Sequence, residues 1–451
     1  MSESSFEVVE ITDLANTGEG VGRDAQGRTA FIPMTTIGDR VEAKILRKRK
    51  RHWHGVVHSF LEKSPQRVEP ACSLFGRCGG CDWQHIPYDA QSEAKARNLQ
   101  QTIRRIARIE YEETPEIATG EAFYETRTRA RFQISRQNRL GFFQRGSSEV
   151  IEIEECPVLT RNLNETLKGL TGLIQTWDVT FREIQMLGGI PKTPKEKANK
   201  ALQLPVAVSL HLPRHARGDS YPKKQVWEAI WEQIQMCLPL VSGIEVWEHR
   251  RRAYTFGHPW ISDGEPRVRY QPSGFAQASF ANNRLLIQSV LSLLEDDFPK
   301  TVLEVYAGRG NLSLPLAQKG AKVVALESDT HAVAEGRRAS KGLNGIDAGT
   351  LIFVPYHDER DDLKHKWKDK QNFPELLLLD PPRRGLSTRI TDQIVKWLPP
   401  RILYVSCDAA TLARDLRRLC DAGYQVEAIR AVDMMPQTSH VESLVLLAHS
   451  E

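Results

Sequence analysis

The chain has 451 residues, of which 40% are hydrophobic and 26% are charged, and its formal net charge is +4. This composition is typical of a folded globular protein and excludes a wholly disordered chain. The apolar runs fall short of the roughly 18 residues of a membrane-spanning helix, and the polar, acidic N-terminus MSESSFEVVE excludes a secretory signal. We therefore expect a cytoplasmic protein, whose length predicts about two to four domains.

Residues 5–61 predict a small all-β domain. Short runs rich in Val, Ile, Phe and Thr alternate with turn signals such as TGEG, DAQG and IGD. This pattern is typical of an OB-like barrel, a fold that often binds single-stranded nucleic acid. Residues 47–51 read Arg-Lys-Arg-Lys-Arg, and His52, Trp53 and His54 follow. Positive charge beside an aromatic ring suits phosphate contact and base stacking, so we expect nucleic-acid binding; the alternative is a basic edge that is only solvated.

Residues 62–270 predict a second domain in which helical and strand patterns are mixed. Residues 90–109 have apolar positions at helical spacing and a basic opposite face. Residues 127–134 and 139–153 are predicted to be strands. Residues 188–200, GGIPKTPKEKANK, are rich in Gly, Pro and Lys and predict a surface loop.

Three cysteines are clustered in PACSLFGRCGGCDW, with five and two residues between them, and a fourth follows in EECPVL. These four are Cys72, Cys78, Cys81 and Cys156. Seven cysteines in a chain expected to be cytoplasmic indicate metal binding or catalysis rather than a disulfide framework. Four thiolates are a ligand set for zinc or for an iron–sulfur cluster, and the spacing leaves both open. Cys237 and Cys420 lack a polar motif, so we interpret them as core residues.

From residue 271 onward the pattern predicts an open, doubly wound α/β sheet. A helix candidate at 283–295 leads into strand-like runs, most of them separated by enough residues for a crossover helix. These runs are 301–306, 321–327, 351–355, 375–380, 402–407 and 442–448. Because ligands of such sheets bind at the carboxyl ends of the strands, we expect the chemistry there.

The first strand of this sheet leads into a glycine-containing turn. Gly308 and Gly310 let the backbone turn tightly and approach a ligand closely. Glu327 is placed at the tip of the second strand, where an acid can accept both hydroxyls of a ribose. Position 313 is Ser, so the G-x-G-x-x-G pyrophosphate fingerprint is absent. We therefore expect a nucleoside without a pyrophosphate, with S-adenosylmethionine as the main candidate, rather than a plain turn with a surface Glu.

Three later segments carry candidate reactive groups at the same edge. A run of four leucines predicts a buried parallel strand that ends in Asp380-Pro-Pro. The next strand ends in Cys407, beside the start of a helix, whose partial positive charge we expect to favour the thiolate. His440 and Glu442 precede the last strand, where either side chain is a candidate base, and a solvated loop is the alternative.

Together these motifs closely resemble the RNA uracil-C5 methyltransferase family, which forms 5-methyluridine in ribosomal and transfer RNA. The resemblance covers nearly the whole chain and is closest in LEVYAGRGNLSLPLA, LLLLDPPRRGL, YVSCDAATLARDL and MMPQTSHVESLVLL. It implies a TRAM-like RNA-binding barrel at 1–61, a central iron–sulfur domain at 62–270 and a methyltransferase domain at 271–451. It also implies RNA as the partner, with 23S ribosomal RNA preferred over tRNA, no membrane association, and a monomer.

The same resemblance assigns roles to individual residues. It implies a 4Fe-4S cluster held by Cys72, Cys78, Cys81 and Cys156. It makes Cys407 the nucleophile and Glu442 the proton acceptor. The implied S-adenosylmethionine contacts are Gln277, Tyr306, Asn311, Glu327, Asp358 and Asp380.

The chain departs from the family pattern at a few positions. Asp408-Ala409 stands where Asn-Pro is usual, Gln437 stands where a His is usual, and Tyr306-Ala307 stands where Phe-Cys is usual. Residues 183–225 match no motif of the family. Because Cys407 and Glu442 are intact, these departures bear on substrate position and leave the expected chemistry in place.

The implied reaction is covalent catalysis on a base that is flipped or already single-stranded. The thiolate of Cys407 adds to C6 of uracil, C5 attacks the sulfonium methyl, and Glu442 removes the C5 proton before elimination. Two alternatives stay open. An RNA cytosine-C5 methyltransferase also uses a thiol, but the prolines after Asp380 have no adjacent cysteine. A non-catalytic iron–sulfur RNA-binding protein is disfavoured by the intact Cys407 and Glu442.

Overall fold

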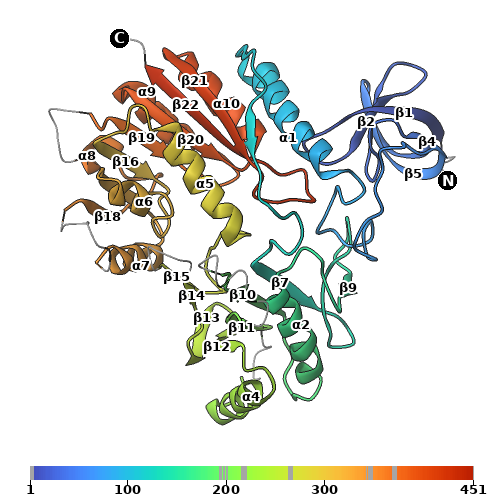
Figure 1. Ribbon diagram of the computed structural model, residues 1–451, viewed down its shortest axis with the longest axis vertical. Coiled ribbons are helices and arrows are strands. Elements are labelled where there is room, and N and C mark those ends of the chain that lie inside the picture. Colours follow the sequence, from blue (N-terminus) through green and yellow to red (C-terminus); the bar gives the residue numbers. More distant parts are fainter. Residues whose placement is uncertain are drawn as a thin grey trace.

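The computed structural model describes residues 5–191, 196, 199, 202–214, 221–262, 268–341, 343, 349–367 and 373–449. These residues form a closed barrel, a seven-stranded sheet, an eight-stranded sheet and a two-stranded ribbon (Figure 1). Among them, no helix is both long and apolar enough to cross a membrane. Much of the loop predicted at 188–200 lies outside the described residues.

The N-terminal strands form a five-stranded closed barrel with the order β1-β2-β3-β5-β4. The strands are β1 (Phe6–Leu14), β2 (Gly20–Arg23), β3 (Thr29–Ile32), β4 (Arg40–Lys48) and β5 (His52–Glu62). Alternate residues of these strands point inward and form a separate small core. The predicted OB-like barrel is confirmed, and its basic run at 47–51 is exposed where β4 leads into β5.

The aromatic residues of the barrel are arranged differently from the prediction. The sequence predicts that Trp53 stacks on bases, and this prediction is wrong, because the side chain is fully buried in the barrel core. Its indole Nε1 donates a hydrogen bond to the Asp24 carboxylate at 3.0 Å. Phe31 and His54 stack at the surface instead, with ring centroids 4.9 Å apart, and His52 packs edge-on against both rings.

The segment that follows the first three cysteines packs on the C-terminal sheet. Helix α1 (Tyr88–Thr102) continues into a π-helical turn, η1 (Ile103–Ala107), and strand β6 (Glu116–Ala118) joins the eight-stranded sheet parallel to β21 (Tyr424–Val432). The expected central domain, 62–270, therefore contributes to two sheets. The helix predicted at 90–109 is present, but its polar side chains are not all on a solvated face. Gln91, Lys95 and Asn98 are buried.

The seven-stranded sheet has the order β13-β12-β11-β10-β7-β8-β9. Its strands are β7 (Arg129–Ile134), β8 (Leu140–Phe143), β9 (Val150–Glu152), β10 (Glu183–Gly188), β11 (Val206–Leu212), β12 (Val241–Glu248) and β13 (Arg251–Gly257). Helices α2 (Arg161–Ile174) and α4 (Lys224–Cys237) pack on its apolar residues. A ribbon of β14 (Ile261–Ser262) and β15 (Arg269–Tyr270) follows. The predicted strand at 139–153 is instead the hairpin of β8 and β9. Cys237 is exposed, so its interpretation as a core residue is wrong.

The C-terminal sheet has the order β18-β17-β16-β19-β20-β22-β21-β6, and β16 to β20 run parallel. Its further strands are β16 (Thr301–Val305), β17 (Lys322–Glu327), β18 (Leu351–Pro355), β19 (Leu376–Leu379), β20 (Arg401–Ser406) and β22 (Glu442–His449). Its helices are α5 (Phe280–Leu293), α6 (Ser313–Gln318), α7 (Thr330–Ser340), α8 (Leu363–Lys366), α9 (Thr388–Trp397) and α10 (Ala409–Cys420). The doubly wound fold is confirmed, with β21 and β6 added beyond the predicted strands.

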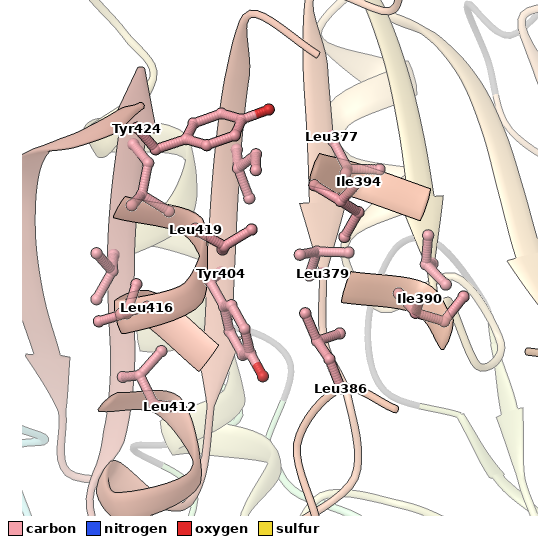
Figure 2. Packing of buried hydrophobic residues seen from close by; sticks show 14 of the residues in the cluster. Leu377, Leu379, Leu386, Ile390, Ile394, Tyr404, Leu412, Leu416, Leu419 and Tyr424 are labelled. Carbon is pink, nitrogen blue, oxygen red and sulfur yellow. The ribbon is translucent and has the colours of Figure 1, made fainter. Parts of the chain in front are cut away.

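Apolar side chains cover both faces of this sheet. Helices α5, α6 and α7 contribute to one core, and α8, α9, α10 and η1 contribute to the other. Figure 2 shows Leu377 and Leu379 of β19 lying toward Ile390 and Ile394 of α9, with Tyr404 of β20 lying toward α10. Alternate residues of β19 therefore face opposite cores, which is why this strand consists of leucine alone.

The burial of Trp53 leads to a stability prediction. Trp53→Ala should lower the free energy of unfolding of the barrel by about 3–5 kcal/mol, because it removes a large core side chain and leaves a cavity. Hydrogen exchange of the barrel amides measures this change. His54→Ala, a half-buried neighbour in the same strand, should change it by less than about 1 kcal/mol. Equal protection in the two variants would contradict the burial of Trp53.

Candidate active site

The candidate reactive residues lie at one edge of the C-terminal sheet. Asp380 follows β19, Cys407 follows β20 and Glu442 begins β22. Strands β20 and β22 pair antiparallel with Ser406 opposite Ser443, so the end of one strand lies beside the start of the other. Because β19 pairs with the other edge of β20, all three side chains are brought to one place.

Burial makes this place unfavourable for negative charge. The pKa of the Cys407 thiol is raised to about 11 by burial, with Glu442 adding to the rise. Burial, with Asp380 adding to it, also raises the pKa of Glu442 well above its ordinary value. The pKa of Asp380 rises to about 7, mainly through burial. Arg383 is the cation that favours the charged forms of both Cys407 and Glu442.

Burial outweighs the expected effect of the start of α10 on the Cys407 thiol, because the net pKa is raised. Asp408 already occupies the positive end of the helix. Its carboxylate accepts hydrogen bonds from the backbone N–H groups of Ala410 and Thr411 at 3.1 and 2.8 Å. Asp408 is therefore the N-cap of α10. An Asn at this position is an equally good N-cap, so this departure from the family pattern preserves the local structure.

The glycine turn after β16 is held in a fixed shape. Gly308 and Gly310 have φ values of 56° and 92°, and Tyr306, with φ of 67°, also lies in the left-handed region. The backbone N–H of Gly308 donates to the Glu327 carboxylate at 2.8 Å. A Cβ at position 310 would lie 2.7 Å from Phe353, so there is no room for a side chain.

Ser313, which breaks the pyrophosphate fingerprint, has a structural role in this turn. Its hydroxyl donates a hydrogen bond to the buried carboxyl of Glu304 in β16. Burial raises the pKa of Glu304 to about 8. The contact ties the first turn of α6 to the centre of the sheet. Sequence reasoning missed Glu304, because the pattern of a buried strand does not show whether an acid in it has a hydrogen-bond partner nearby.

Three of the expected cofactor residues, Tyr306, Asn311 and Asp358, lie in two hydrogen-bonded pairs. The Tyr306 hydroxyl donates to Asp358 at 3.2 Å, and Arg384 lies 3.7 Å from the same carboxylate. Asn311 exchanges hydrogen bonds with Asn283 of α5 at 2.7 and 2.9 Å. Sequence reasoning missed Asn283, although it lies in the GFAQASFANN segment that contains Gln277.

Gln277 itself lies in the loop before α5. The carbonyl of the preceding residue, Ala276, accepts a hydrogen bond from the Arg129 guanidinium at 3.4 Å, which ties this loop to β7. Arg129 also donates to the Pro272 carbonyl at 3.3 Å. The seven-stranded sheet therefore holds the loop that carries Gln277.

The other expected base candidate, His440, lies beside Arg383. A nitrogen of its ring is 3.5 Å from the guanidinium. Burial and the neighbouring arginine lower the pKa of His440, which favours its neutral form.

The four cysteines of the predicted metal site line a single cavity of about 230 Å³, even though Cys156 is distant in sequence. The four are Cys72, Cys78, Cys81 and Cys156. Burial raises the pKa of Cys81 to about 11 and that of Cys156 to about 12. Arg127 also lines the cavity, and both of these thiols favour its charged form. Within the described part of the chain, no three Cys, His, Asp or Glu side chains are grouped as ligands of a single metal ion.

A doubly wound sheet with a glycine turn, an acid at the second strand tip and a thiol at a later one defines a nucleoside-binding transferase class. The sequence profile described as tRNA (Uracil-5-)-methyltransferase matches residues 260–450, and the TRAM domain profile matches residues 7–57. The 23S rRNA (uracil(1939)-C(5))-methyltransferase RlmD of Enterobacter sp. (strain 638) is 32% identical, over 97% of this chain and 95% of that protein. RlmD of Marinomonas sp. (strain MWYL1) is 33% identical, over 98% and 94%.

The chain therefore belongs to the RNA uracil-C5 methyltransferase family. The fold also matches the crystal structure of the Pyrococcus abyssi tRNA (uracil-54, C5)-methyltransferase in complex with S-adenosyl-L-homocysteine. The TM-score is 0.70 at 24% identity, and the match covers 98% of this chain and 99% of that one.

The electrostatics of Cys407 lead to a labelling prediction. Arg383→Met should raise the thiol pKa further, because it removes the cation that favours the thiolate. Alkylation of Cys407 by iodoacetamide at pH 9 should then slow by about threefold, because a smaller fraction of the thiol is ionised. Mass spectrometry measures the rate, with the exposed Cys237 as the internal standard.

Arg384→Met is the matched control for this experiment, because Arg384 pairs with Asp358 rather than facing the thiol. It should leave the alkylation rate of Cys407 unchanged. Equal slowing in both variants, or none in Arg383→Met, would contradict the assignment of Arg383 as the neighbouring cation.

Proposed function

We propose that this protein transfers a methyl group from S-adenosylmethionine to C5 of a specific uridine in RNA, and that the RNA is 23S ribosomal RNA. The observation that carries the proposal is the convergence of Cys407 and Glu442 at one end of the β20–β22 pair. The choice of RNA is supported by the two RlmD relatives, which are similar over nearly their whole length.

Cys407 is the proposed nucleophile. Its sulfur bonds to C6 of uracil, and the electrons of the C5–C6 double bond move toward C5 and the C4 carbonyl. This makes C5 able to take the methyl group that S-adenosylmethionine supplies when bound. With a pKa of about 11, the thiol is protonated at neutral pH, so it gives up its proton to solvent, which reaches the partly exposed Cys407, as the sulfur attacks. Arg383 favours the charge that develops there.

Glu442 is the proposed base for the last step. After methyl transfer, C5 carries both the methyl group and its proton, and the covalent bond to sulfur is still present. Removal of that proton re-forms the double bond and expels Cys407. Burial raises the pKa of Glu442, and a carboxylate of higher pKa is a stronger base for this proton.

The cofactor residues are proposed from the turn and strand tips around the glycine loop. Glu327 is suited to the ribose hydroxyls, and its carboxylate already meets the turn through Gly308. Asn311 and Gln277 offer amide groups, and Asp380 lies between this turn and Cys407. Tyr306 and Asp358 form one hydrogen-bonded pair, which we expect to act together.

The cysteine cavity is proposed to hold a 4Fe-4S cluster. Four thiols around one space supply the complete ligand set of a cubane. Arg127 beside the thiols offsets negative charge at this buried place. Cys72, Cys78, Cys81 and Cys156 would hold the cluster, which would link the 72–81 loop to the Cys156 segment.

RNA binding is proposed for the barrel. The basic run 47–51 is exposed, and the ring group of Phe31, His52 and His54 lies on the neighbouring strands. Cations that contact phosphates next to stacking rings are typical of single-stranded nucleic-acid surfaces.

The covalent step leads to a trapping prediction. RNA with 5-fluorouridine at the target has no C5 proton to remove, so addition and methyl transfer should proceed and elimination should stop. A covalent protein–RNA adduct that depends on S-adenosylmethionine should therefore accumulate on denaturing gels. Cys407→Ala should abolish it, because that sulfur makes the bond. Glu442→Gln should trap an adduct even with ordinary uridine. Turnover retained by Cys407→Ala would contradict the mechanism.

The cysteine cavity leads to a metal prediction. Anaerobically purified protein should be brown and contain about four irons per chain, as a four-cysteine cubane requires. Cys156→Ser should lose the colour and the iron. Cys420→Ser, a change at the end of α10 away from the cavity, is the control and should keep both. Zinc in place of iron in the metal analysis would contradict the cluster.

A further inference from the structure

The loop from Asp433 to Val441 leads directly into Glu442, and one face of helix α1 holds it. Tyr88, Gln91 and Lys95 are spaced three and four residues apart, so they lie on the same side of the helix. Each of these side chains contacts the loop. They are polar, and Gln91 and Lys95 are almost completely buried.

The first contact fixes the beginning of the loop. The Lys95 ammonium is 2.7 Å from the Asp433 carboxylate, and both side chains are fully buried. The Tyr88 hydroxyl donates to the other oxygen of Asp433 at 3.0 Å. Lys95 also donates to the carbonyl of Met435 at 3.3 Å. A buried ion pair with these additional hydrogen bonds permits little freedom at this end of the loop.

The second contact fixes the middle of the loop at Gln437. Its side-chain oxygen accepts from the Gln91 amide at 3.1 Å, and its backbone N–H donates to the Gln91 oxygen at 3.1 Å. Its carbonyl accepts from the backbone N–H groups of Asp82 and Trp83 at 2.9 and 3.1 Å. These two residues directly follow Cys81.

Gln437 also has a left-handed backbone, with φ of 67°. A residue with a side chain keeps this conformation only where its surroundings hold it. Here the surroundings are the four hydrogen bonds that Gln437 makes with Gln91, Asp82 and Trp83. The shape of the loop before Glu442 therefore depends on α1 and on the segment after the cysteines.

We propose that the Tyr88–Gln91–Lys95 face of α1 is a positioning element that places Glu442 for proton removal from C5. The proposal rests on the proposed function, because it assigns Glu442 to that step. Cys407 follows β20 and lies outside this loop. The proposal therefore predicts that loss of the amide pair slows the final elimination and leaves addition and methyl transfer at their wild-type rates.

Gln437→Gly and Gln91→Ala test the proposal from the two sides of the amide pair. Glycine at 437 removes the side chain and also relieves the left-handed backbone, so the variant keeps the backbone bonds to Asp82 and Trp83. Turnover on uridine RNA should fall about 10- to 100-fold in both variants, the cost of misplacing a reacting group by about 1 Å. The rate of adduct formation on 5-fluorouridine RNA should stay at the wild-type value. An adduct with ordinary uridine should consequently accumulate.

Gln100→Ala is the matched control, because Gln100 lies on another side of α1 and donates to the Tyr111 carbonyl. It should change neither rate. A parallel fall of turnover and adduct formation in the two test variants would overturn the proposal, since it would show a general structural role. Unchanged turnover would overturn it as well. Failure of the wild-type protein to form the fluorouridine adduct would instead contradict the proposed function itself.

Discussion

The antiparallel pairing of β22 with β20 is the constraint on which the candidate site depends. In an all-parallel sheet, the strand next to β20 would bring only its carboxyl end to this edge. Because β22 runs the other way, its first residue, Glu442, lies beside the last residues of β20 and hence beside Cys407. The proposed nucleophile and the proposed base are thus placed by backbone hydrogen bonds of a buried sheet, while the loop before Glu442 is held by α1.

The same burial sets the chemical character of the site. Cys407, Glu442 and Asp380 all have raised pKa values, and Arg383 is the cation that opposes the rise for the first two. These three side chains therefore stay protonated, and so uncharged, up to a higher pH than they would in water. Each gains basicity or nucleophilic strength when it loses its proton, which suits the proposed reaction, in which a carbon–sulfur bond is made and broken.

Much of this arrangement was predictable from sequence, because it follows from local patterns. A strand that is buried on both faces needs apolar side chains throughout, as in the four leucines of β19. The tight turn after β16 needs glycines. In the barrel strands, inward-facing and outward-facing residues alternate as predicted. Most of the missed features depend on partners that are distant in sequence. Trp53 is buried because the barrel strands close around it. Cys237 is a different case, because it ends α4 and is exposed. Gln91 and Lys95 looked like solvated residues because their partners, Gln437 and Asp433, are more than 300 positions away.

Position-by-position mapping of 5-methyluridine in ribosomal and transfer RNA, by mass spectrometry of a strain that lacks this protein, tests the central claim most directly. The account predicts that one position in 23S ribosomal RNA loses its methyl group, that the wild-type protein restores it, and that Cys407→Ala does not. A strain that keeps every 5-methyluridine without the protein, or one that Cys407→Ala restores, would contradict it.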